Sequence, residues 1–202
     1  MKPYFFKRLV SYLIDIFIVF MLATFITSFI PTNENVKQLT EEMRKTLEIN
    51  SKNEDEIKQQ ISKTNDITYQ LSKETVMSSL VTITTYILYF VVFPVYNKGQ
   101  TLGKKIMKLK MKNISGTELT INNMLFREMI LHSILINIIS TILVMILNKE
   151  NFIISNYILS CIQMIFFVII LMMIVIRNDG RGLHDIIGNT IVENEEVQKW
   201  EI

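Results

Sequence analysis

The chain has 202 residues, half of them hydrophobic, and a mean hydropathy of +0.32, so its long apolar runs favour a polytopic membrane protein over a soluble domain. The net charge of +2 is too small to indicate a nucleic-acid partner. The single cysteine, Cys161, excludes an intramolecular disulfide and a cysteine-based zinc site.

Four apolar runs are long enough to span a bilayer, which requires about 20 residues. They cover residues 9–30, 76–96, 124–147 and 153–176. The first run is too long for the apolar part of a cleaved signal peptide, so we expect it to remain as a span. The last two runs are separated only by NKEN and its neighbours, which predicts a tight helical hairpin.

Basic residues flank the predicted spans unevenly, and this bias sets the expected orientation. They cluster before the first span, after the second and after the fourth, so we expect both termini to be cytoplasmic. The fold class predicted is an all-α membrane protein with four transmembrane helices and a small cytoplasmic sheet of two strands. The predicted segments are 1–30 (N-terminus and first span), 31–75 (extracytoplasmic and polar), 76–96 (second span), 97–123 (cytoplasmic basic turn and strand), 124–176 (third and fourth spans) and 177–202 (cytoplasmic C-terminal segment).

The first span contains an aspartate, Asp15, seven residues after Arg8. The two residues lie on one helix face, about 10 Å apart along the axis, so only long side chains, water or a third residue could bridge them. Ionisable residues within spans normally face other helices or a wet cavity. Asp15 is therefore either ionised and paired with a cation from another segment, or neutral because burial raises a carboxyl pKa, and the neutral state would make it a proton carrier. The alternative is a residue that fixes helix packing through hydrogen bonds.

The polar segment that follows the first span allows two interpretations. Val36, Leu39, Met43 and Leu47 recur at helical spacing with charged residues between them, which predicts two short amphipathic helices that break near NSKNEDE. A solvated, partly disordered loop fits the composition as well.

The segment after the second span begins with GQTLGKK. Its spacing does not fit a phosphate-binding loop, which needs four residues between the glycines and a Ser or Thr after the lysine. We interpret it as a tight turn whose lysines, Lys104 among them, meet anionic lipid headgroups at the inner leaflet.

Alternation of Met107, Leu109 and Met111 with lysines predicts a strand with one apolar face. NTIVEN near the C-terminus is a second strand candidate, and we expect the two to pair. Thr120 is placed to cap the helix that enters the third span.

The residues after the fourth span, RNDGRGLHDIIG, predict a turn and a short interfacial helix that carries His184 and Asp185. His132, in the third span, is interpreted as a polar packing residue. We find no nucleophile, base and orienting group at suitable spacing and no metal-ligand cluster. The sequence therefore predicts neither an enzyme nor a cofactor.

Together these motifs resemble the RDD family of membrane proteins, named for one arginine and two aspartates. The first-span pattern matches Arg8 and Asp15. The family's glycine-rich turn matches Gly99, Gln100, Thr101, Gly103 and Lys104. The arginine that opens the family's next span matches Arg127. The family's closing GLHDxxxxTxV pattern matches Gly182, Leu183, His184, Asp185, Thr190 and Val192. The outer segment lies outside the resemblance. Two departures are Ser11, where the family often has alanine, and Lys108, where it often has glycine.

The resemblance implies a helical integral membrane protein, with cation/proton exchange proposed for some members. We expect Arg8 to pair with Asp185 if the inner ends of the first and fourth spans converge. The preferred function is a small cation/proton-linked transporter, or a component of one, in a bacterial cell membrane, and four spans then favour a homo-oligomer. The alternative is a scaffold or regulator that binds another membrane protein.

Overall fold

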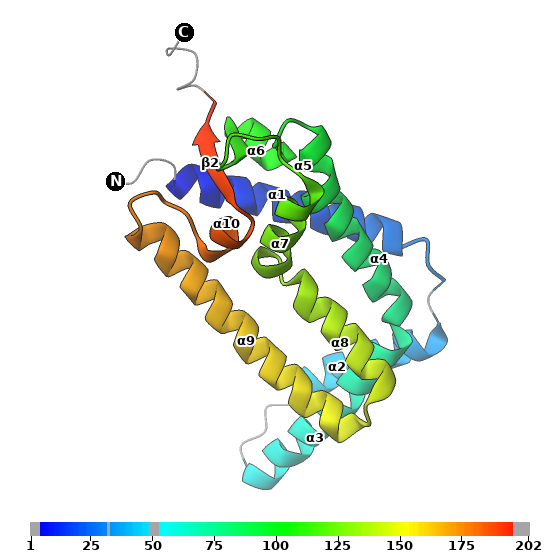
Figure 1. Ribbon diagram of the computed structural model, residues 1–202. Coiled ribbons are helices and arrows are strands. Elements are labelled where there is room, and N and C mark those ends of the chain that lie inside the picture. The colour runs from blue at the N-terminus through cyan, green and yellow to red at the C-terminus, as the bar shows by residue number, and fades with distance from the viewer. Residues whose placement is uncertain (1–4, 32, 49–52, 196–202) are drawn as a thin grey trace.

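The computed structural model describes residues 5–31, 33–48 and 53–195, which form a mainly helical fold with one small sheet (Figure 1). The elements in chain order are α1 (Phe5–Thr27), α2 (Glu34–Glu48), α3 (Glu54–Glu74), α4 (Val76–Ile87), a π-helical turn (Leu88–Val92), α5 (Phe93–Tyr96), α6 (Leu102–Ile106), β1 (Leu109–Asn113), α7 (Ile121–Leu131), α8 (Ile134–Ile146), α9 (Lys149–Ile176), α10 (Leu183–Ile187) and β2 (Thr190–Asn194).

Three helical stretches of the described chain are long and apolar enough to cross a membrane. They are α1, the continuous stretch Val76–Tyr96, and α9. The predicted third span, 124–147, is not one straight helix: α7 and α8 meet at an angle of 70°. The break falls at Ser133, whose φ of 53° is left-handed and cannot continue a right-handed helix. The structure thus contains three candidate spans, or four if the bent pair counts as one.

The connection NKEN is the start of α9 rather than a loop. Asn148 precedes the helix, and its side-chain oxygen accepts a hydrogen bond from the Asn151 backbone nitrogen at 3.1 Å. Glu150 lies in the first turn, where a negative charge is favourable. This cap explains why Lys149 and Glu150 belong to the helix rather than to a loop. The loop of the hairpin is therefore shorter than predicted.

The outer segment forms the two predicted helices, α2 and α3, in its described residues. Gln60 of α3 donates a hydrogen bond to the Thr46 carbonyl oxygen of α2 at 2.7 Å. The α3 helix also contacts the start of α9, since Lys149 Nζ lies 2.5 Å from Asp66 Oδ1. The α2–α3 pair lies at the opposite end of the molecule from α6 and β2 (Figure 1). Part of the predicted break, residues 49–52, lies outside the described residues.

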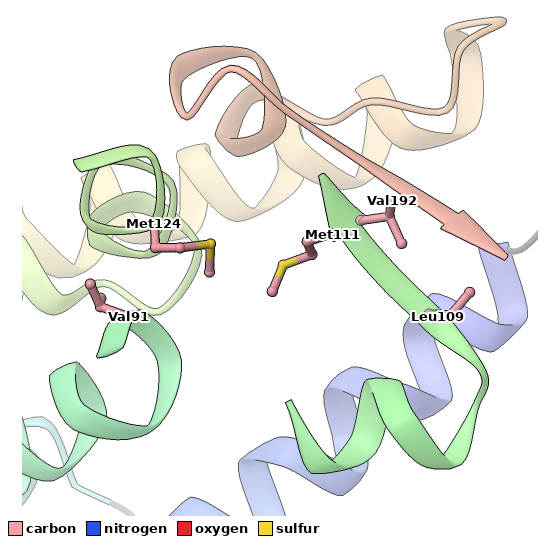
Figure 2. Packing of buried hydrophobic residues seen from close by; sticks show 5 residues of the cluster. All are labelled: Val91, Leu109, Met111, Met124 and Val192. Carbon is pink, nitrogen blue, oxygen red and sulfur yellow. The ribbon is translucent and has the colours of Figure 1, made fainter. Parts of the chain in front are cut away.

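The two predicted strands pair as expected. β1 and β2 are antiparallel, with Met111 opposite Val192 and Leu109 opposite Asn194. Met111 points from this sheet toward Met124 of the neighbouring helix (Figure 2). Leu109 and Val192 of the sheet and Val91 of the second span belong to the same buried cluster. The sheet is stable here because one of its faces is buried against helices.

A π-helical turn interrupts the second span just before Pro94. Proline lacks a backbone N–H and disturbs the preceding helical turn, which the wider π-helix accommodates. As a result three consecutive side chains, Tyr89, Phe90 and Val91, are all buried. Tyr89 reaches Asp15, Phe90 stacks on His132, and Val91 joins the sheet core.

Candidate functional site

Asp15 is 1% exposed and accepts hydrogen bonds from three groups. Tyr89 Oη donates to its Oδ1 at 2.7 Å, and the Gly103 backbone nitrogen donates to the same oxygen at 2.8 Å. Thr101 Oγ1 donates to Oδ2 at 2.5 Å, and Lys104 Nζ lies 3.8 Å from Oδ2. Asp15 is therefore a dry carboxylate whose oxygens are occupied by neighbouring donors.

Glycine at position 103 allows α6 to approach α1 this closely. A Cβ atom at Gly103 would lie 2.3 Å from the Ser11 carbonyl oxygen and 2.8 Å from Asp15 Cγ. Thr101 begins the helix as its N-cap, so the glycine-rich turn directs its donors at Asp15. The turn binds a carboxylate of its own chain.

Lys104 belongs to this cluster and does not meet lipid headgroups as predicted. It is 9% exposed. Burial lowers its pKa, while the carboxylates of Asp15 and Glu128 oppose that effect. Its neighbour Lys105 is exposed.

We expect Asp15→Asn to destabilise the protein. An amide cannot accept at both atoms, so its NH2 group would face a donor and leave buried groups unpaired. We estimate a loss of about 1–3 kcal/mol. The measurement is the midpoint of chemical unfolding in detergent, followed by far-UV circular dichroism, with Asp66→Asn on the outer face as control.

Ser11 is the family departure on the same helix, and its buried hydroxyl has no hydrogen-bond partner in the structure. Removing an unsatisfied buried polar group removes its desolvation penalty. We expect Ser11→Ala to raise stability by about 1 kcal/mol, measured by the same unfolding transition. A lower midpoint would show that the hydroxyl is bonded in the membrane.

Asp185 is fully buried and is bound by both arginines of the family pattern. Arg8 Nη2 lies 2.5 Å from Asp185 Oδ2, which confirms the expected pairing. Arg127 Nη1 contacts Oδ1, and the Gly182 backbone nitrogen donates to Oδ2 at 3.0 Å. Asp185 thus joins α1 and α7 to α10.

Burial alone would raise the pKa of Asp185, but the charges of Arg127 and Arg8 outweigh it and hold that pKa well below its usual range. Burial lowers the pKa of His184 to about 3, so this imidazole is neutral at physiological pH. A Cβ atom at Gly182 would lie 2.7 Å from the His184 ring. The GLHD motif is therefore packed around one ionised carboxylate.

The ionic contacts continue from Arg127 into the third span. Arg127 Nε donates to Glu128 Oε1 at 2.9 Å, and Glu128 Oε2 lies 2.6 Å from His132 Nδ1. All three residues are buried. The chain of contacts ends at His132, which lies at the break between α7 and α8.

A cavity of about 970 Å³ lies between α3, α4, α8 and α9, with His132 in its wall. Its lining is unusually polar for a membrane interior and includes Ser72, Ser79, Thr82, Asn137, Ser140 and Gln163. Hydroxyl and amide groups find no partners in lipid, so within a bilayer such a lining favours water or a polar solute.

The structure groups the predicted residues into two clusters. Thr101, Gly103 and Lys104 surround Asp15, whereas Arg127 and His184 join Arg8 at Asp185. Within the part of the chain that the structure describes, no hydrogen bond or ion pair joins Arg8 directly to Asp15. Gly99 serves the turn instead: its φ is 80°, and a Cβ atom there would lie 2.1 Å from the Met111 carbonyl oxygen.

Two residues of the site were missed in the sequence. Glu128 follows Arg127 directly and precedes His132 by four residues, so an acid within an apolar run was the available signal, as it was for Asp15. Tyr89 offered no signal, because its hydroxyl reaches Asp15 only through the π-helical turn.

Comparison with known proteins gives a single result. A family model of the RDD family matches residues 2–189. Searches of curated proteins and of solved structures gave no match. The family match covers nearly the whole chain and agrees with the apolar helices, so this multi-pass membrane protein belongs to the RDD family.

Proposed function

We propose that the protein is a small transporter, or a component of one, that moves a cation in a proton-linked process across the cell membrane. The observation that carries this proposal is the polar cavity, which is lined in part by the broken helix pair α7–α8. Helices interrupted within the membrane are tolerated where they are buried in protein or line a cavity, and they often form binding sites in transporters.

Asp15 does not carry the transported proton in this proposal. It does not line the cavity, and its oxygens are occupied by Tyr89, Thr101 and Gly103. Its role is to hold α6 against α1. In this proposal the residues that bind the transported cation or proton lie in the cavity wall instead.

We place the sheet end of the molecule in the cytoplasm and the α2–α3 pair outside. The basic residues flanking the spans support this orientation. Three or four spans are few for a complete carrier, so a homo-oligomer is the assembly proposed. No catalytic step is part of the proposal.

A scaffold or regulator of another membrane protein is the second candidate. Two observations favour it: Asp15 lies in a dry, fully bonded setting, and α2 presents a charged surface in which Arg44 pairs with Glu41 and Glu48. In that case α2 and α3 would form the binding surface.

Flux in liposomes tests the proposal. Purified protein is reconstituted, and proton movement is followed with a pH-sensitive dye under inward Na⁺ or K⁺ gradients. We expect cation-dependent flux from the wild type and a loss of at least about tenfold in Thr82→Leu, which places an apolar side chain in the cavity wall.

Thr84→Leu is the matched control, because it makes the same change two residues away on the exposed face of α4. Both threonine hydroxyls donate to a backbone carbonyl four residues earlier, Thr82 at 2.9 Å and Thr84 at 2.8 Å. Absence of flux from folded wild type would reject transport. Binding of a membrane partner through α2 and α3 would then be tested.

A further inference from the structure

His132 occupies an unusual position in the wall of the polar cavity. It follows the last residue of α7, and the next residue, Ser133, has the left-handed conformation that breaks the helix. Its ring stacks on Phe90 with centroids 3.5 Å apart and on Tyr12 at 5.5 Å. The ring is thus fixed by aromatic packing.

Hydrogen bonding leaves this histidine incomplete. Nδ1 lies 2.6 Å from Glu128 Oε2. Nε2 is buried and has no hydrogen-bond partner. Buried polar atoms are normally satisfied, so an unpartnered ring nitrogen on a residue of the cavity wall points to a place where a proton or a polar group can bind.

The short distance defines where a proton must lie. Lone pairs on Nδ1 and Oε2 would repel at 2.6 Å, so a proton lies between the two atoms. A neutral ring therefore carries its hydrogen on Nδ1 and has a free lone pair on Nε2. Nε2 is the atom at which a further proton can bind.

The surrounding charges balance when His132 is neutral. The cations Arg8, Lys104 and Arg127 match the carboxylates of Asp15, Glu128 and Asp185 in number. Groups that face the ring are Glu128 from α7, Lys104 from α6, Tyr12 from α1 and Tyr86 from α4.

We propose that His132 and Glu128 form a proton-binding site at the wall of the polar cavity. A proton from cavity water forms an N–H bond at His132 Nε2, and the imidazolium is held against the Glu128 carboxylate. The proton leaves to water by the same route, and no other bond changes. The site would supply the proton step of the proposed transport, on which this inference rests.

Nuclear magnetic resonance of ring nitrogens tests the site directly. The chain has two histidines, so protein labelled with ¹⁵N-histidine in lipid nanodiscs gives few signals, and His132→Gln identifies the one of interest. We expect the His132 ring to gain a second proton, at Nε2, as the pH is lowered. His184 should stay neutral at any pH well above its pKa of about 3.

Glu128→Gln should move the His132 titration to lower pH by about one unit or more, because a nearby carboxylate stabilises the imidazolium. Glu128→Asp keeps the negative charge, so its His132 titration should lie close to that of the wild type. This variant replaces Glu128→Gln in the test if the amide variant folds poorly. Glu193→Gln, on the distant strand β2, should leave the titration unchanged.

Two results would overturn the site: a His132 ring that keeps one protonation state throughout, or an unchanged titration in Glu128→Gln. The flux assay is independent of this measurement. Titration without flux would support the proton site and reject transport, whereas flux with an inert His132 would reject the proton site alone.

Discussion

Asp185→Asn is expected to lower the free energy of unfolding by about 3–5 kcal/mol, because it leaves two buried guanidinium groups without their shared carboxylate. Arg8 and Arg127 both bind Asp185, and Asp185 has no exposed surface. Water does not reach buried charged groups, so solvation cannot replace the carboxylate that the two guanidinium groups lose. The measurements are the yield of folded protein in detergent and the midpoint of its chemical unfolding.

Asp179→Asn is the matched control, since Asp179 also pairs with an arginine. Arg177 Nη2 lies 2.7 Å from Asp179 Oδ2, but both side chains are more than one-third exposed. Water replaces the lost partner there, so little change in the unfolding midpoint is expected. Equal effects of the two variants would mean that the Asp185 cluster is solvated.

The Asp185 cluster also predicts how stability depends on pH. Its pKa is lowered in the folded protein, so its contribution is complete above the unfolded value of about 4. The contribution is lost as pH falls below that value toward the folded pKa. Wild type should therefore lose stability below about pH 4, and Asp185→Asn should show a weaker dependence there.

Sequence patterns predicted most of the fold, because they arise from local periodicity. The three long spans and the pairing of Leu109–Asn113 with Thr190–Asn194 follow from apolar length and from a period of two. The helix break at Ser133 could not be predicted, since neither proline nor glycine interrupts the run 124–147. Only tertiary contacts stabilise a left-handed serine there.

The sequence predicted the site only in part, because some of its contacts depend on tertiary structure. Arg8 and Asp185 were matched correctly because unlike charges at converging helix ends have few other partners. The roles of Asp15 and Lys104 were wrong or incomplete because they depend on the direction of the turn at Gly103. Lys108, where the family often has glycine, has a φ of 56°, which explains the family preference.

Gly103→Ala is the second variant with a large expected effect. The added Cβ atom would lie 2.3 Å from the Ser11 carbonyl oxygen, and backbone atoms of two packed helices cannot move apart locally. α6 would separate from α1, and Asp15 would lose the bonds from Gly103 and Thr101. We expect a loss of about 3 kcal/mol or more, which combines overpacking with unsatisfied buried groups.

Gly116→Ala separates this steric effect from the general effect of adding a methyl group to a glycine. Gly116 has a φ of 76°, and a Cβ atom there would meet nothing within 4 Å, so only the backbone strain of about 1–2 kcal/mol is expected. Unfolding midpoints of the two variants, measured in one detergent, decide the comparison. If Gly103→Ala unfolds no earlier than Gly116→Ala, α6 does not pack on α1 in the membrane. Asp15 would then be open to solvent, and a direct role for it in proton transfer would have to be tested again.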